Sequence, residues 1–455
     1  MQPNQSMRRI VSLGVPLLFA RLTHYLHQIV DSAMLGHYGD GSLELAAIGV
    51  AGLFAWILNT MLWPLSNGIQ AITSRRFGRE DSGNPESRYQ TGGALDNGLI
   101  TALYASGIAI GASFLARPIL SLMLSTPQIL ELSVDYISIV RFGLLPSGFY
   151  FAIQGFLAAV NQTKYAMWSS IISNVLNIIL NYILIFGRLG FPEMGIRGAA
   201  LGTALSMTVA CAFLVAVAIK GGYASKYRLF RFRNLSRRVQ RDIVRVAIPP
   251  GVQNVIALSI FMTYQTLIED YSAIYLAATH AVFAFFRLNK TMIGGFARSA
   301  GILAGNALGR GEKDDAHRLI GLSGVLGAIL ALVVGVATWL LRSQIAGLFS
   351  NDPATIAAIV DALTFFLPFY FVEALGYSFE MVFVSNGYGR YVLASEFSTN
   401  VVFILGATIA ARLLLPEMIR YAWLSFGLYQ VSHALIMVLG FARKRWVDVE
   451  VERAT

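Results

Sequence analysis

Long apolar blocks recur along the whole chain, separated by short polar connections. None of the blocks alternates apolar and polar residues with the period of two expected for barrel strands, and all are far longer than such strands. Because helices and closed barrels are the only structures that span lipid, the blocks predict helices of about 20 residues or more. Twelve blocks are placed, to within a few residues, at 10–35, 45–74, 94–116, 128–158, 164–187, 197–219, 243–268, 273–306, 319–341, 355–385, 391–414 and 420–442.

The composition agrees with an all-α integral membrane protein. Of the 455 residues, 56% are hydrophobic and 13% are charged, about half the charge density of soluble domains. Soluble enzymes, nucleic-acid-binding proteins and disulfide-rich secreted domains are therefore excluded, and Cys211 is the single cysteine. Nucleotide-binding P-loop and common hydrolase motifs do not occur, so we expect a non-enzyme without cofactors.

Lysine and arginine residues set the expected orientation. With the N-terminus in the cytoplasm, 24 of the 35 basic residues fall in inside loops, 6 in outside loops and 5 within spans. By the positive-inside rule, both termini of a multi-pass protein in the plasma (inner) membrane should be cytoplasmic.

A weak internal repeat divides the chain into halves. Ile10 and Pro16 recur as Ile243 and Pro249, an offset of 233 residues. Similar offsets relate the ends of the second and eighth blocks. We therefore predict two parallel, pseudo-symmetric six-helix lobes, at 1–222 and 243–455, as in many secondary transporters. The basic connector at 223–242 is interpreted as an orientation anchor, with binding of anionic membrane lipids as the alternative.

Polar residues inside the first block share one helical face. Arg21, His24, Gln28 and Asp31 are spaced 3, 4 and 3 residues apart. Such a stripe is costly in lipid and should line a cavity or a partner helix. Asp31 could bind a coupling ion, or it could be an interfacial carboxylate without a transport role.

A second polar set is expected at a similar depth. Asn174, Asn177 and Asn181 share a face of the fifth block, and Thr203 lies in the sixth. With Asp31 they could bind Na⁺, whereas a lone carboxylate in an apolar pocket could carry H⁺. The alternative is hydrogen bonding that holds the helices together.

The C-terminal half has its own charges within predicted spans. Arg287 and Lys290 lie in the eighth block, and Glu373 and Glu380 share a face of the tenth. We expect Lys290 to pair with Glu373, either as a structural pair or as a switch or substrate contact. The sequence assigns no partner to His433.

These residues also carry a resemblance. The segment VDSAMLGHYGDGSLELAAIGV around Asp31 resembles the first-helix signature of the multidrug and toxic compound extrusion (MATE) family, with Pro16 at the family's spacing of 15 residues. Residues 174–206 resemble its fifth and sixth helices. Ala277, Ala278 and His280 are similar to its eighth-helix A-A-x-x-H-Q pattern, with alanine in place of the glutamine.

The resemblance implies a V-shaped, bacterial-type exporter of cationic or amphipathic compounds that alternates access in exchange for H⁺ or Na⁺. It assigns the coupling ion to Asp31, Asn177, Asn181 and Thr203, and a bend to Pro16. From their positions in the spans, and not from the resemblance, we expect Arg21, His24, Gln28 and Asn174 to line the N-lobe cavity. His280, Arg287, Lys290, Glu373 and Glu380 are expected to line the C-lobe cavity or to form ion pairs there.

The chain departs from the family pattern at three acidic positions. Asn181 stands where some members have a second aspartate, and Ala257 and Leu375 occupy acidic positions of NorM-like members. We therefore favour H⁺ over Na⁺ as the coupling ion. Separately, we expect the protein to be a monomer. The alternatives are a lipid-linked oligosaccharide flippase and a non-transporting receptor or assembly partner.

Overall fold

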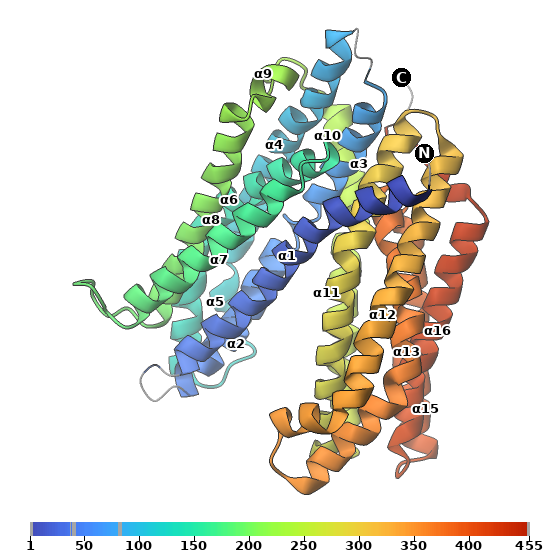
Figure 1. Cartoon of the computed structure of the whole chain (residues 1–455). Helices are drawn as coiled ribbons and strands as arrows, with labels where there is room; N and C mark the ends of the chain where they lie inside the picture. The colour runs from blue at the N-terminus through green and yellow to red at the C-terminus, as the bar shows by residue number, and fades with distance from the viewer. Residues whose placement is uncertain (1–2, 37, 39–41, 81–83, 453–455) are drawn as a thin grey trace. The chain divides into compact units, whose positions relative to one another are not determined.

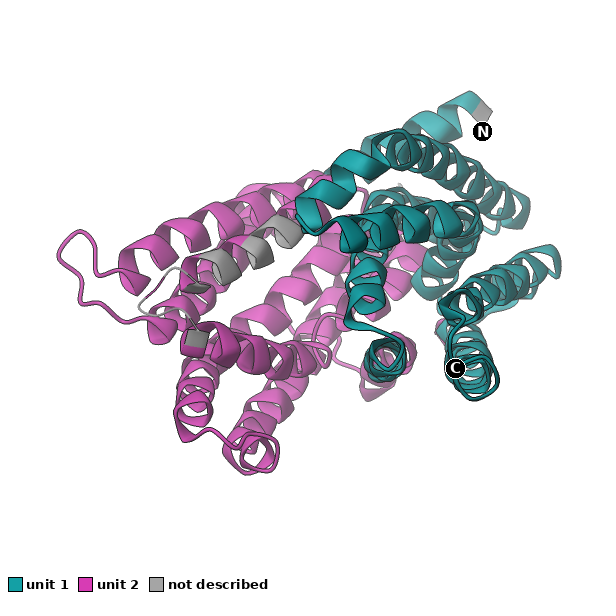
Figure 2. Ribbon diagram, turned by 90° about the horizontal axis from the view of Figure 1, so that it is seen from below, with its two compact units in different colours: residues 1–18, 252–450 teal, residues 19–251, 451–455 magenta. Residues whose placement is uncertain are grey.

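Every regular element in the described part of the chain is a helix (Figure 1). The computed structural model describes residues 3–36, 38, 42–80 and 84–452, and omits the side chains of residues 3, 24–29, 31–33, 36 and 42. The described residues form two compact units, which Figure 2 distinguishes by colour. Unit 1 comprises residues 1–18 and 252–450, and unit 2 comprises residues 19–251 and 451–455.

Unit 2 contains the helices of the first half of the chain. It begins within α1 (Pro3–Gly36) and ends within α10 (Arg237–Glu269). Its buried apolar side chains form a large core around Ile153 and Phe156 and a second core around Ala199. The helices between α1 and α10 are α2 (Ser42–Asn59), α3 (Leu65–Gly78), α4 (Pro85–Ser113), α5 (Ala116–Ser121), α6 (Pro127–Ala159), α7 (Lys164–Ile185), α8 (Ile196–Lys220) and α9 (Tyr223–Tyr227).

Unit 1 contains the helices of the second half. One core is aromatic and surrounds Phe286 and Phe366, whereas the other surrounds Phe383 and Trp446. The helices after α10 are α11 (Ala273–Gly309), α12 (Lys313–Phe349), α13 (Pro353–Ser385), α14 (Gly389–Thr399), the π-helical segment η1 (Asn400–Ala407), α15 (Thr408–Leu414), α16 (Ile419–Ala442) and the 3₁₀ segment η2 (Arg445–Asp448).

The predicted blocks are helical, with one correction. The second block is not one helix but two, α2 and α3, separated by a turn at residues 60–64. Pro64 precedes α3, and a proline lacks the N–H that a continuous helix requires. Among the described residues, eight helices have the length and hydropathy to cross a membrane by themselves. Large apolar side chains on their surfaces, such as Val333 and Leu340, are 60% exposed, as expected of residues that face lipid.

Two helices contribute residues to both units, and both contain prolines close to the division. In α1 the division follows Leu18, two residues after Pro16, and in α10 it follows Gly251, directly after Pro249 and Pro250. The predicted lobe boundaries lie elsewhere, in the connector at 223–242. The predicted boundaries mark where the six-helix repeat starts again along the sequence, and not which residues pack into one compact unit. The division into two lobes therefore stays a prediction.

The connector is held against α4 in unit 2. The carboxylate of Asp96 accepts hydrogen bonds from the backbone N–H groups of Phe230 (2.8 Å) and Phe232 (3.0 Å). Asn97 accepts one from the N–H of Ser236 at 2.8 Å. Phe230 and Phe232 both have positive φ values, 62° and 51°, a conformation that needs such support in residues with a Cβ. The connector is therefore an ordered segment that is fixed to α4 by hydrogen bonds.

Candidate functional site

The predicted polar set on α7 and α8 comes together in unit 2. Asn177 and Asn181 are fully buried, one helical turn apart. Asn181 Nδ2 donates to Asn177 Oδ1 at 3.0 Å, and Asn177 Nδ2 donates to Thr203 Oγ1 at 3.3 Å. Two amides and a hydroxyl are thus linked across two helices, and these groups are of the kind whose oxygens can bind a cation or accept a proton donor.

Close contact between α7 and α8 creates this arrangement. Gly198 and Gly202 lie one turn apart on α8, the spacing of small residues that lets helices approach in lipid. A Cβ at Gly198 would lie 2.6 Å from the backbone of Leu184, and a Cβ at Gly202 would lie 2.1 Å from Asn181 Oδ1. The sequence therefore needs glycine at both positions to bring Thr203 within reach of Asn177.

Gly202→Ala should disrupt the polar set. The added methyl group would overlap Asn181 Oδ1, so Asn181 must turn away or the helices must separate, at a cost of about 1–3 kcal/mol. We expect efflux from cells to fall about tenfold at equal protein level, since 1.4 kcal/mol corresponds to tenfold. The matched control is Gly107→Ala on α4, where a Cβ would have nothing within 4 Å. Wild-type efflux by Gly202→Ala would contradict the role of this contact.

The first-helix candidates are only partly visible. The backbone of α1 is helical through Pro16 and as far as Gly36. Arg21 is half-buried. The side chains of His24, Gln28 and Asp31 lie outside the described residues, so their expected roles stay predictions.

Asn174, the last member of the predicted N-lobe set, is half-buried, one turn before Asn177. Within the described part of the chain, its Nδ2 is buried without a hydrogen-bond acceptor. It therefore shares the helix face of the polar set, but no contact of the described residues ties it to Thr203.

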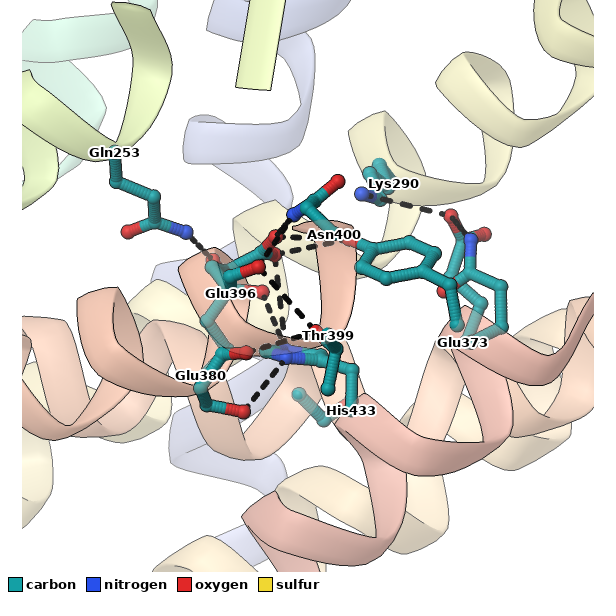
Figure 3. Close-up of polar contacts among 12 residues, drawn as sticks. Gln253, Lys290, Glu373, Glu380, Glu396, Thr399, Asn400 and His433 are labelled. Atoms are coloured by element: carbon teal, nitrogen blue, oxygen red, sulfur yellow. Dashed lines mark hydrogen bonds and ion pairs between the residues drawn. The ribbon is translucent and has the colours of Figure 1, made fainter. Parts of the chain in front are cut away.

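In unit 1, Lys290 and Glu373 form the expected ion pair. Lys290 Nζ lies 3.6 Å from Glu373 Oε1, and Figure 3 shows the two side chains facing each other. The other carboxylate oxygen accepts a hydrogen bond from Asn289 at 3.0 Å, and Gln430 donates to Oε1 at 3.4 Å. Glu373 is thus a buried carboxylate satisfied by one charge and two amides. The part that this pair plays in transport stays a prediction.

Glu380 lies in a different cluster, two turns further along α13. Its Oε1 accepts a hydrogen bond from Gln253 Nε2 at 2.8 Å, and its Oε2 lies 3.4 Å from His433 Nε2 (Figure 3). His433 Nε2 also lies 3.8 Å from Glu396 Oε1. All three of Glu380, Glu396 and His433 are buried.

Sequence reasoning missed Glu396 and His433 as a pair. A polar pattern at helical spacing marks both places, because Thr399 and Asn400 follow Glu396 by 3 and 4 residues and Gln430 precedes His433 by 3. The available signal was the cost of an ionisable residue within a membrane span, which makes each one a candidate by itself.

The remaining C-lobe candidates are separate from these clusters. His280 is exposed on α11, with Nδ1 3.4 Å from Gln265 Nε2. Arg287 is also exposed, and no ion pair joins it to another described residue. The structure therefore unites Lys290 with Glu373, but it does not bring all five predicted residues into one site.

Together, the long apolar helices and the buried polar clusters define a polytopic membrane protein of the transporter type. The chain belongs to the MatE family, whose sequence profile matches residues 16–183 and 249–409. The expected family and all-helical fold are therefore confirmed, and membership of a transporter family makes the chain a non-enzyme.

Bacterial relatives are similar over most of their length. A probable multidrug resistance protein NorM from Halalkalibacterium halodurans is 26% identical over 385 residues, covering 82% of this chain and 81% of the relative. A probable multidrug resistance protein NorM from Streptococcus pneumoniae serotype 4 is 24% identical over 431 residues, covering 95% and 92%.

Solved structures share the fold at lower identity. A multidrug resistance MATE family transporter in an outward-facing conformation superposes with a TM-score of 0.85 at 20% identity, covering 98% of this chain and 97% of that one. A MATE protein in a straight conformation gives a TM-score of 0.87 at 20% identity, with 97% of each chain covered.

Proposed function

We propose that this protein is a secondary antiporter that exports cationic or amphipathic compounds from the cytoplasm in exchange for H⁺. The observation that carries the proposal is the buried Asn177–Asn181–Thr203 set, which the sequence expects beside Asp31. The printed names of the relatives, probable multidrug resistance proteins, support the substrate class. Asp31 would carry the coupling ion, and the amides and hydroxyl would bind it or the protonated carboxyl group.

The choice of H⁺ over Na⁺ rests on the number of charges near the ion. The visible part of the set contributes only neutral oxygens, from Asn177, Asn181 and Thr203. A Na⁺ site with Asp31 would then have a single carboxylate, whereas H⁺ needs no more than one. Asn181, which replaces a second aspartate of some members, therefore favours H⁺.

The proposed setting follows from the distribution of basic residues. Nine of them lie between Lys220 and Arg245, in and around the connector that is strapped to α4. With this segment on the inside, both termini are cytoplasmic in the plasma (inner) membrane. A monomer suffices, because each proposed contact lies within one chain.

Reconstituted protein tests the proposal directly. Proteoliposomes containing the wild-type chain receive ethidium as substrate, under a pH gradient and separately under a Na⁺ gradient. We expect ethidium uptake into the vesicles to release protons from the vesicles into the external medium. A pH gradient should drive this uptake in the absence of Na⁺. A pH indicator and ethidium fluorescence measure the two fluxes.

Three other outcomes would contradict parts of the proposal. Dependence on Na⁺ alone would mean that the neutral oxygens complete a Na⁺ site with Asp31. Silence under both gradients would favour a lipid-linked oligosaccharide flippase, which an envelope defect after gene deletion would support. Ethidium binding without any gradient-driven flux would indicate a receptor.

A further inference from the structure

The buried cluster of Glu380, Glu396 and His433 has the composition of a metal site. One ligand atom from each residue, a carboxylate oxygen or an imidazole nitrogen, lies within 4.8 Å of the other two. The residues come from three different helices of unit 1, α13, α14 and α16, and Figure 3 shows the carboxylates of Glu380 and Glu396 facing the imidazole of His433.

The charge balance of this cluster depends on the protonation of His433, whose Nε2 lies within 4 Å of a carboxylate oxygen of both Glu380 and Glu396. Lys290 pairs with Glu373, and no lysine or arginine of the described chain forms an ion pair with Glu380 or Glu396. With His433 neutral, two carboxylates remain buried in a membrane-spanning region, where uncompensated charge is costly. A bound ion of charge +2 would neutralise them.

His433 supplies the second, independent observation. It is 4% exposed, and its Nε2 atom is buried without a hydrogen bond. That nitrogen points at two carboxylate oxygens, 3.4 Å away on Glu380 and 3.8 Å away on Glu396. Where Nδ1–H donates to Ser395 Oγ, Nε2 carries the lone pair, and a positive charge between Nε2 and the two oxygens then removes their repulsion.

The distances favour a metal ion over a shared proton. A charge-assisted N–H···O hydrogen bond would draw the nitrogen and oxygen to about 2.7–2.9 Å, shorter than either separation. Ligand atoms around zinc, with bonds of about 2.0–2.2 Å, lie about 3.3–3.6 Å from one another. The two nitrogen–oxygen separations, 3.4 Å and 3.8 Å, are close to this range, and the three ligand atoms, within 4.8 Å of one another, would draw together around a bound ion.

The surrounding groups hold each ligand in place. Gln253 donates to the far oxygen of Glu380 at 2.8 Å, and Asn400 donates to Glu396 Oε2 at 2.6 Å. The hydroxyl of Tyr429 lies 3.0 Å and 3.1 Å from the two oxygens of Glu396. Ser395 Oγ lies 3.1 Å from His433 Nδ1. Metal ligands are oriented by outer contacts of this kind, and the oxygen of Glu396 that faces His433, Oε1, accepts one of them from Tyr429.

The backbone is also irregular at this position. The π-helical segment η1 begins at Asn400, one turn after Glu396, and continues to Ala407. Such segments are rare and occur frequently at functional sites. Here the wider turn lies directly beside Glu396 and its hydrogen-bond donor Asn400.

We infer that Glu380, Glu396 and His433 bind a divalent transition-metal ion of the zinc or manganese class. One imidazole and two carboxylates suit these ions, whereas Mg²⁺ and Ca²⁺ prefer oxygen ligands alone. The ion ties α13, α14 and α16 together within unit 1, and water completes its coordination. This site is independent of the proposed export activity, because binding is measured without a gradient or substrate.

Metal binding to the whole purified chain, without an affinity histidine tag, tests the inference. Protein in detergent is stripped with EDTA and equilibrated with buffered Zn²⁺, and bound zinc is measured by mass spectrometry. We expect one zinc per wild-type chain and an unfolding temperature about 5 °C higher with zinc than with EDTA. Co²⁺ in place of Zn²⁺ should give visible absorption bands of a low-symmetry site.

Variants locate the ion. His433→Ala and Glu396→Gln should lose stoichiometric zinc, and Ser395→Ala, which keeps all three ligands, should weaken binding about 10–100-fold. His317→Ala, a histidine outside the cluster, should bind like the wild type. If a ligand variant fails to fold, two measurements still test the site. Ser395→Ala keeps all three ligands, and the wild-type chain can be compared with and without EDTA.

Two results would overturn the inference. One is a wild-type chain that takes up no stoichiometric Zn²⁺, Mn²⁺ or Co²⁺ at micromolar free metal, including a chain whose cluster only takes up protons on titration. The other is equal zinc binding by wild type and His433→Ala. Neither result affects the H⁺–ethidium exchange measured in proteoliposomes, so the two proposals fail separately.

Discussion

Asp31→Asn is expected to abolish coupled export while leaving the amount of folded protein in the membrane unchanged. A gradient can drive the transport cycle only if its ion binds the two conformations with different affinity. Asparagine has nearly the same size as aspartate, but it neither binds H⁺ nor carries a charge. The expected loss in the initial rate of H⁺-driven ethidium flux is about 100-fold, which corresponds to removal of the differential affinity.

The same substitution on the surface of unit 2 provides the control. Asp135 pairs with Arg197 at 2.7 Å, and both side chains are substantially exposed, so Asp135→Asn should transport at close to the wild-type rate. Proteoliposomes of equal protein content measure both variants. Retention of H⁺-driven flux by Asp31→Asn would remove Asp31 from coupling and return it to the role of an interfacial carboxylate.

Lys290→Met is expected to destabilise unit 1 severely. Glu373 is 3% exposed, and Lys290 is its ion-pair partner. Loss of Lys290 leaves the buried carboxylate of Glu373 uncompensated, at a cost of about 3 kcal/mol, the lower end of the range for buried pairs, because Lys290 itself is 36% exposed. For a chain of this size we expect the unfolding temperature to fall by about 10 °C, measured in detergent by a scanning thermal assay.

The double variant distinguishes a charge effect from a packing effect. Glu373→Gln removes the stranded charge and keeps hydrogen-bonding groups for Asn289 and Gln430. Lys290→Met with Glu373→Gln should therefore recover most of the lost stability. Arg287→Met, which removes an exposed positive charge from the same helix, should shift the unfolding temperature by only 1 or 2 °C, about the effect of a surface substitution. A Lys290→Met chain as stable as wild type would show that Glu373 does not need its partner.

The class of fold can be read from the amino-acid sequence alone. Long apolar blocks with few charges indicate segments that span lipid, where every backbone N–H and C=O group must be hydrogen-bonded within the protein. Helices and closed barrels meet this requirement, and the absence of a period of two excludes the barrel. The sequence also indicated the polar set on α7 and α8 and the Lys290–Glu373 pair. Both are visible in sequence because polar residues in a membrane span are rare and therefore informative. The break at Pro64 was in the sequence as well, but the surrounding apolar residues concealed it.

Which polar residues of different helices meet depends on the packing of the whole bundle. Glu380, Glu396 and His433 lie on three helices, and nothing in their spacing along the chain connects them. Likewise, the sequence alone does not distinguish Gly202 among the 42 glycines of the chain. Its importance follows from its packing against Asn181. Local pattern fixes which face of a helix is polar, because the helical period is local. The pairing of faces depends on how side chains interlock between helices, which is a property of the whole bundle.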